Sequence, residues 1–156
     1  MYVMDAQAWF PEHSPFATRI VMPKPFTLVL PNLPVTFMND DHAHARALLE
    51  AMVAGVETGD ARLGKTCRAF HEHNREHFDR EEAAMQATGF PPYAVHKAEH
   101  TQALTWLDSL ASQAETGPVS PPLRQAIGVE LPAWYLRHIQ TMDTVTANWI
   151  AAHGTD

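Results

Sequence analysis

The pattern of apolar positions after residue 38 predicts helices, because apolar residues recur there at every third or fourth position. The first helix can be capped by Asn39, Asp40 or Asp41 and ends near Gly59. Its buried stripe consists of His42, Ala45, Leu49, Met52 and Val56. A second helix follows and ends before Gly89. Its stripe consists of Leu63, Cys67, Phe70, His77, Glu81 and Met85.

Two further helices are predicted in the rest of the chain. The third opens at Pro92 and ends at Gly117. Its stripe consists of His96, His100, Ala103, Leu107 and Leu110. The fourth begins near Ser120 and contains Pro132, where we expect a bend because proline removes a backbone donor. Its stripe consists of Leu123, Ile127, Leu131, Trp134, His138, Val145 and Trp149.

Residues 1–37 are predicted to form an extended arm. Prolines are too frequent there for a continuous helix or a central strand, at Pro11, Pro15, Pro23, Pro25, Pro31 and Pro34. Because the segment is also apolar in places, we expect it to pack along the helices. The expected fold is therefore all-α, an up-down-up-down four-helix bundle over residues 38–154 with an extended N-terminal arm.

Composition narrows the class of protein. A length of 156 residues fits one domain, and a net charge of -7 with only 11 basic residues argues against a nucleic-acid partner. No apolar window approaches the roughly 18 residues that a membrane span requires, and the start of the chain lacks the features of a signal peptide. The single cysteine, Cys67, fits a buried residue in a reducing compartment. We therefore expect a cytoplasmic protein with no membrane contact.

Several of the 10 histidines lie on the predicted buried stripes. Burying an ionisable group without a partner costs several kcal/mol. His77 and Glu81 are four residues apart, as are His96 and His100, so each pair lies on one face of its helix. These pairs predict a shared metal site. The neighbouring charged residues fall on the solvent-facing side of the same helices: Arg80, Glu82, Lys97 and Glu99.

The first and fourth helices offer further donors. His138 and Asp143 are five residues apart, about 140° on an ideal helical wheel, so this pair by itself is a weak signal. On the first helix, His42 lies on the apolar stripe, whereas His44 joins it only if the register slips by two residues. We therefore predict His42 as the donor, with His44 as the alternative.

The size of the donor set indicates the kind of metal centre. Five histidines and two carboxylates exceed the needs of one tetrahedral zinc and suit two carboxylate-bridged ions with one coordination position left open. Two irons are the economical choice. The Glu-x-x-His motifs of ferritin-like di-iron proteins do not occur on a buried stripe. His71-Glu72 lacks the second histidine of a zinc-protease helix.

Taken in order, these donors resemble the ligand pattern of the hemerythrin family, which is His, then His-x-x-x-Glu, then His-x-x-x-His, then His-x-x-x-x-Asp. The neighbouring residues also look like the bacterial branch of that family, and the resemblance covers residues 38–152. The similar segments are His77-Phe78 with Glu81-Glu82 and Met85, then Gly89-Phe90-Pro91-Pro92, then Leu131-Pro132-Ala133-Trp134.

The resemblance implies a role for each donor. One iron would bind His96, His100 and His138, the other would bind His42 and His77, and the bridges would be Glu81, Asp143 and an oxo or hydroxo group. Dioxygen would bind at the open position of the second iron, taking two electrons from the iron pair and a proton from the bridging hydroxide. An apolar lining that slows the entry of water is expected from Phe70, Met85, Leu107, Trp134 and Met142.

The sequence leaves more than one function open. The first is reversible dioxygen binding in a carrier, store or sensor, which leaves room for a separate redox or signalling partner protein. Histidine-rich ligation favours this function, as in the family that the chain resembles. The alternative is a redox enzyme acting on peroxide, nitric oxide or ferrous iron, with His73, one turn before His77, as proton source. A metal-free interaction bundle is a third hypothesis.

Overall fold

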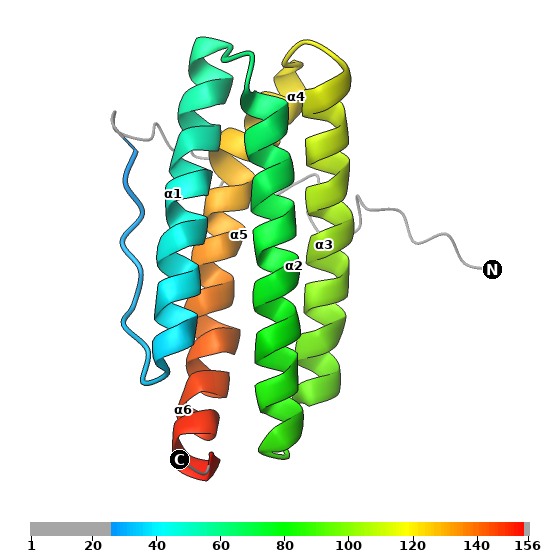
Figure 1. Cartoon of the computed structure of the whole chain (residues 1–156). Helices are drawn as coiled ribbons and strands as arrows, with labels where there is room; N and C mark the ends of the chain where they lie inside the picture. Colours follow the sequence, from blue (N-terminus) through cyan, green and yellow to red (C-terminus); the bar gives the residue numbers. More distant parts are fainter. Residues whose placement is uncertain (1–25, 155–156) are drawn as a thin grey trace, which may run out of the picture.

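A computed structural model describes residues 26–154, which form helices joined by short links, with no strand in that range. Three long helices come first, and the fourth run of the bundle follows them (Figure 1). This fourth run is divided into five segments. The long helices are α1 (Thr36–Thr58), α2 (Leu63–Ala87) and α3 (Tyr93–Thr116). The fourth run consists of α4 (Pro121–Gln125), η2 (Ala126–Glu130), α5 (Leu131–His138), η3 (Ile139–Asp143) and α6 (Thr144–His153).

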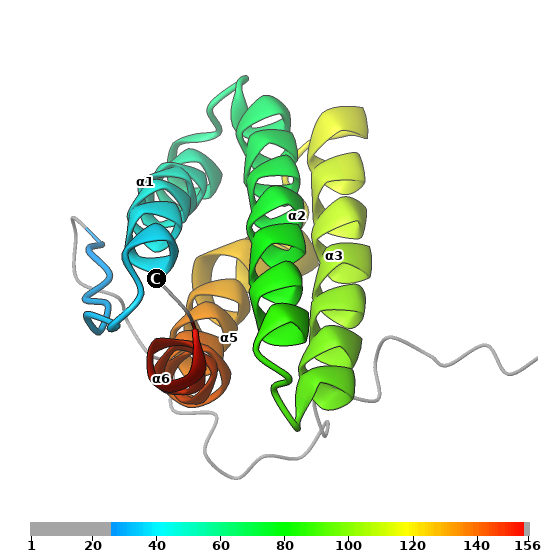
Figure 2. The same ribbon diagram turned by 60° about the horizontal axis from the view of Figure 1, so that its bottom comes forward.

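The four runs alternate in direction and enclose a common core, which confirms the predicted up-down-up-down bundle (Figure 2). The core contains the apolar stripes of all four runs, including Leu49, Phe70, Leu107 and Leu131. Cys67 is buried among them, as its place on the second stripe predicts. In the part of the chain that the structure describes, no helix is both long and apolar enough to cross a membrane.

The first helix begins earlier than its sequence predicts. Its N-cap is Val35, so Asn39 lies inside the helix and does not cap it. The Asn39 side chain instead accepts a hydrogen bond from the Leu33 amide and donates one to the Leu33 carbonyl, each at 2.8 Å. The helix ends as expected at Gly59, which adopts a left-handed conformation with φ of 69° and donates its amide to the Gly55 carbonyl.

The described part of the predicted arm runs beside α1 (Figure 1). Leu28 and Leu33 are buried in the bundle core, and the Leu28 amide donates to Glu50 Oε1 at 3.0 Å. Residues 1–25, which make up most of that arm, lie outside the described residues. The division of the chain at residue 37 therefore stays a prediction.

The fourth run contains two π-helical segments that the apolar pattern does not reveal. The irregularity expected at Pro132 lies in the residues just before it, in η2, where the Leu131 amide donates to the Ala126 carbonyl five residues back. The wider turn accommodates a proline, whose ring would otherwise clash with the carbonyl four residues earlier. The second segment, η3, lies between His138 and Thr144.

Candidate metal centre

The predicted donors converge in the interior of the bundle. Each of them is at most 2% exposed to solvent: His42, His77, Glu81, His96, His100, His138 and Asp143. They come from α1, α2, α3, α5 and η3, so each of the four runs contributes. The structure therefore brings together every donor that the sequence pattern selected.

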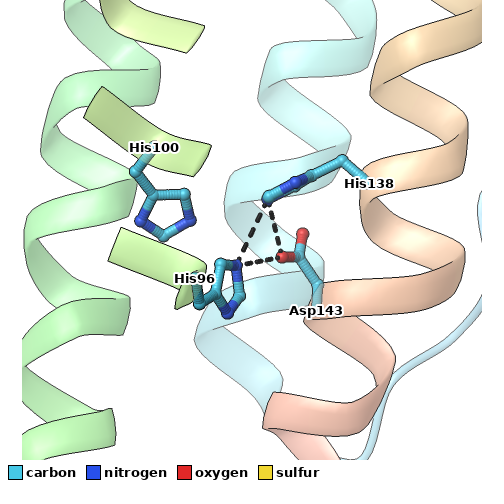
Figure 3. A group of neighbouring side chains, drawn as sticks. All are labelled: His96, His100, His138 and Asp143. Carbon is cyan, nitrogen blue, oxygen red and sulfur yellow. Dashed lines mark hydrogen bonds and ion pairs between the residues drawn. The ribbon is translucent and has the colours of Figure 1, made fainter. Parts of the chain in front are cut away.

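One group of donors consists of His96, His100, His138 and Asp143 (Figure 3). Each offers one ligand atom, and these atoms all lie within 4.8 Å of one another. Asp143 Oδ1 lies 3.0 Å from His138 Nε2 and 3.2 Å from His96 Nε2. The two imidazole Nε2 atoms lie 3.4 Å apart. This spacing suits donors that surround a single cation.

A second group consists of His42, His77 and Asp143, with ligand atoms again within 4.8 Å of one another. Asp143 Oδ2 lies 3.1 Å from His42 Nε2, whereas Oδ1 faces the first group. The two oxygens of one carboxylate thus serve two neighbouring sites, as a bridging ligand would.

Glu81 lies between the same two groups. Its Oε2 atom is 3.5 Å from His100 Nε2 and 3.6 Å from His77 Nε2, and Oε1 is 3.8 Å from His96 Nε2. These separations are longer than a hydrogen bond with good geometry. They leave room for a cation between each pair of atoms.

The π-helical segment η3 explains how His138 and Asp143 meet. On an ideal α-helix the two would point about 140° apart. The wider turn of a π segment, with hydrogen bonds over five residues, reduces the angle per residue, so that both side chains reach the same point. The Thr144 hydroxyl donates to the Ile139 carbonyl five residues back at 2.7 Å, which matches the π-helical spacing.

The buried donor atoms fit a pair of cations. Glu81 Oε1 and Oε2, His77 Nε2 and His100 Nε2 have no hydrogen-bond partner within residues 26–154. Leaving such atoms desolvated and unpaired costs free energy, and most buried polar atoms in proteins are satisfied. Imidazole and carboxylate donors in this number suit two first-row transition metals.

Three of the histidine rings are oriented by a polar contact at Nδ1, the ring nitrogen that is not directed at the donor cluster. His77 Nδ1 lies 3.1 Å from Asp41 Oδ2, His96 Nδ1 lies 2.9 Å from Thr146 Oγ1, and His100 Nδ1 lies 3.1 Å from Glu82 Oε1. Such contacts fix the tautomer in which Nδ1 carries the proton and Nε2 offers a lone pair to a metal.

Sequence reasoning missed these orienting residues. Glu82 and Arg80 were expected only to face solvent, but Glu82 contacts His100 and Lys97, and Arg80 holds Asp41 with two hydrogen bonds of 2.7 and 3.1 Å. Asp41 was considered only as a helix cap. Glu82 directly follows Glu81 in the sequence, and this position does not predict that its side chain contacts the next helix.

The protonation of the donors suits metal binding. Burial, together with His96 and His138, lowers the pKa of His100 to about 2, and burial is the main cause that lowers the pKa of His77. Both imidazoles are therefore neutral, as metal ligands must be. Burial, followed by the charge of Asp143, raises the pKa of Glu81 well above its usual range, so that carboxylate needs a neighbouring cation to ionise.

Asp143 behaves in the opposite way. Burial alone would raise its pKa, but His138, with hydrogen bonds from His42 and His96, lowers that pKa well below its usual range. His138 gains from the same pairing: burial would lower its pKa, and the Asp143 charge outweighs burial and raises it. Without a metal the pair is thus stabilised in charged form, and a cation bound there would displace the His138 proton.

His44, the alternative donor on the first helix, lies outside the cluster. It is exposed, and its ring packs against that of His73 with centroids 4.3 Å apart. His73 Nε2 lies 2.8 Å from the Asp41 carbonyl oxygen, so this imidazole also makes its contact outside the donor groups. The geometry selects His42 for the cluster, as its apolar stripe predicts.

Aromatic rings cover the donors of the first group. Phe78 stacks on His100 with ring centroids 3.8 Å apart, and Trp134 stacks on His138 at 5.2 Å. The expected apolar lining is buried at Phe70, Met85, Leu107 and Trp134. Met142 is half-buried and lines a surface cavity of about 220 Å³ that reaches His96.

Comparison with known proteins gives a consistent assignment. The family model described as "Hemerythrin HHE cation binding domain" matches residues 33–150. The chain is 31% identical over 116 residues to a bacteriohemerythrin of Ralstonia nicotianae, covering 74% of this chain and 81% of that protein. It is 25% identical over 119 residues to a bacteriohemerythrin of Methylococcus capsulatus, covering 76% and 89%.

A solved structure supports the same fold. A crystal structure of a hemerythrin with a leucine replaced by tyrosine superposes with a TM-score of 0.67 at 24% identity, covering 76% of this chain and 90% of that one. The family match spans all four helical runs and every donor of the candidate centre. The chain belongs to the hemerythrin family, whose members hold a di-iron centre and bind dioxygen.

Proposed function

We propose that this protein binds dioxygen reversibly at a non-haem di-iron centre, as an oxygen carrier, store or sensor. The observation that carries the proposal is the pair of buried donor groups that share Asp143 and face Glu81. Family membership supports iron as the metal and dioxygen as the ligand.

The proposal assigns the donors to two irons. His96, His100 and His138 would hold one iron, and His42 and His77 the other, with Glu81 and Asp143 as bridges. Bound there, an iron pair would supply two electrons and an open coordination position to dioxygen. The asymmetry between the two groups supports an open position beside His42 and His77, because that group has one histidine fewer.

The surrounding residues support binding and release over turnover. Asp41, Thr146 and Glu82 hold imidazole rings in place, which limits rearrangement of the donors. The buried aromatic and aliphatic side chains exclude water from the centre. His73, the proton source that an enzyme reaction would need, makes its hydrogen bond to a backbone carbonyl away from the donors.

The compartment and partners stay predictions. A cytoplasmic location, the lack of a nucleic-acid or membrane partner, and a separate redox or signalling protein all rest on the composition of the chain. The location would be tested by fractionating cells that express the full chain.

The test is iron content combined with an optical spectrum. The native chain should bind about two irons, and the reduced protein should develop a stable charge-transfer spectrum in air that reverses when dioxygen is removed. His77→Ala should lose at least one iron, because the second group would keep only one histidine. His44→Ala is the matched control and should keep both irons, since His44 is exposed.

Three results would contradict the proposal. A native chain without stoichiometric iron would favour a metal-free interaction bundle. Full iron content in His77→Ala would remove His77 from the centre. Immediate autoxidation in air, or rapid turnover of peroxide or nitric oxide, would favour a redox enzyme over a carrier.

A further inference from the structure

Tyr135 presents a buried hydroxyl that the donor groups do not use. The residue is 2% exposed, and its hydroxyl has no hydrogen-bond partner among the described residues. Thr146, another buried hydroxyl in the same helical run, has a partner in His96 Nδ1. An unpaired buried hydroxyl is costly, so Tyr135 would gain free energy from a ligand that can accept a hydrogen bond.

Tyr135 lies nearer to one of the two donor groups, the group that contains His42 and His77. It lies on α5 three residues before His138, so it is about one turn from a metal donor. Its ring meets the His42 ring edge-on with centroids 6.3 Å apart, and the His42 ring lies 4.9 Å from that of His77. Tyr135 therefore belongs to the side with two histidines, where the proposed function leaves a coordination position open.

The surroundings of Tyr135 keep it a hydrogen-bond donor. Its ring packs against the ring of Phe70, with centroids 5.8 Å apart, and this contact holds the Tyr135 ring in place. A phenol hydroxyl ordinarily keeps its proton at neutral pH, so Tyr135 can donate it to a nearby hydrogen-bond acceptor.

We propose that the Tyr135 hydroxyl donates a hydrogen bond to the small ligand that occupies the open position beside His42 and His77. This role rests on the proposed function and deepens it, because it makes Tyr135 a residue that determines how long dioxygen is retained. Small anions that bind iron and accept hydrogen bonds, such as azide, should use the same donor.

The test compares Tyr135→Phe with the native full chain, both loaded with iron, oxidised for the azide measurement and reduced for the dioxygen measurement. The substitution removes one hydroxyl and keeps the ring. Azide should bind about three- to tenfold more weakly to the variant, the loss expected for one hydrogen bond, and dioxygen should dissociate faster by a similar factor. Tyr93→Phe is the matched control and should leave both values unchanged, since the Tyr93 hydroxyl bonds with Gln86 at the surface.

A second readout identifies the hydrogen bond itself. The infrared stretching band of bound azide should shift when Tyr135 is replaced by phenylalanine and stay in place in Tyr93→Phe. Equal azide affinity and an unchanged band in Tyr135→Phe would overturn the proposal. So would a phenolate-to-iron absorption band in the native protein, because Tyr135 would then be a metal ligand and not a donor.

Iron content distinguishes a hydrogen-bonding role of Tyr135 from a role in positioning His42, and both from a failure of the proposed function. About two irons in both proteins, with weaker azide binding only in Tyr135→Phe, supports the proposal. Loss of iron in Tyr135→Phe with normal azide affinity at the iron that remains would overturn it, because Tyr135 would then act by positioning His42. If the native chain binds no iron, the proposed function itself fails; if native iron and dioxygen binding are intact, only the role of Tyr135 is at stake.

Discussion

Asp41 connects the surface of the bundle to the buried donor cluster. Its carboxylate lies 3.1 Å from His77 Nδ1 and accepts two hydrogen bonds from Arg80, while its backbone carbonyl contacts His73. Burial would raise the pKa of Asp41, but the hydrogen bonds with His77 and Arg80 lower it to about 2. Asp41 is therefore ionised at neutral pH and holds His77 in the tautomer that a metal requires.

We expect Asp41→Asn to weaken iron binding by about tenfold, because residues that orient a ligand typically contribute a factor of 10 to 100 in metal affinity. Iron affinity would be measured by competition with a chelator. Asp40→Asn is the control: it removes the same charge from the neighbouring exposed position and should change affinity little. Equal losses in the two variants would point to a general charge effect.

The pH dependence of stability gives an independent test of the same contact. Because the pKa of Asp41 is lowered from 3.8 to about 2, its contribution is fully present above pH 3.8 and is lost as the pH falls toward 2. For the metal-free protein, we expect native and Asp41→Asn to differ by about 1 kcal/mol in unfolding free energy at pH 5, a value reduced for solvent screening. Urea titrations should show this gap closing between pH 4 and 2.

At the scale of elements, the π segment η3 is the feature that brings His138 and Asp143 together in the donor cluster. It places His138 and Asp143 within 3.0 Å of each other although they are five residues apart. π segments are rare and usually occur as short insertions at functional sites. Here the insertion also leaves Thr144 able to bond with the Ile139 carbonyl at 2.7 Å.

We expect Thr144→Val to destabilise the bundle by about 1 kcal/mol, because it removes a half-buried hydrogen bond without changing the shape of the side chain. It should also weaken iron binding by loosening Asp143. Thr105→Val is the control, since its hydroxyl bonds with the Thr101 carbonyl on the exposed face of α3. Urea unfolding and chelator competition would check both; identical effects from the two substitutions would argue against a special role for η3.

At the scale of the whole molecule, the metal pair would connect all four runs of the bundle. The donors come from helices that are far apart in the sequence, and several of their atoms lack a partner of their own. A cation that binds only the folded state stabilises it by mass action. The bundle should therefore fold less stably without its metal.

We expect removal of iron by a chelator to lower the Tm by about 5–10 °C, the shift that corresponds to roughly 3 kcal/mol in a domain of this size. Calorimetry before and after chelation would measure it, and adding ferrous iron back anaerobically should restore the native value. His77→Ala, which should hold less iron, should show a smaller drop. A Tm that does not respond to chelation would mean that the helices do not depend on a shared metal.

The sequence by itself determined the helices, their order and which histidines and carboxylates are buried. Apolar residues at three- and four-residue spacing mark the face of a helix that must leave water, so a histidine such as His77 or His96 on that face was predicted to be buried. The same periodicity selected His42 over His44. These predictions succeed because they depend on local geometry, which the period of the α-helix fixes.

Only the tertiary structure decided how the donors are held. The π segments, the contact of Glu82 with His100 and that of Asp41 with His77 depend on which helices become neighbours and at what rotation. The buried hydroxyl of Tyr135 also becomes a feature only once α5 packs against α1 and α2. A spacing rule describes one helix at a time, whereas these contacts are formed between helices or by departures from the ideal turn.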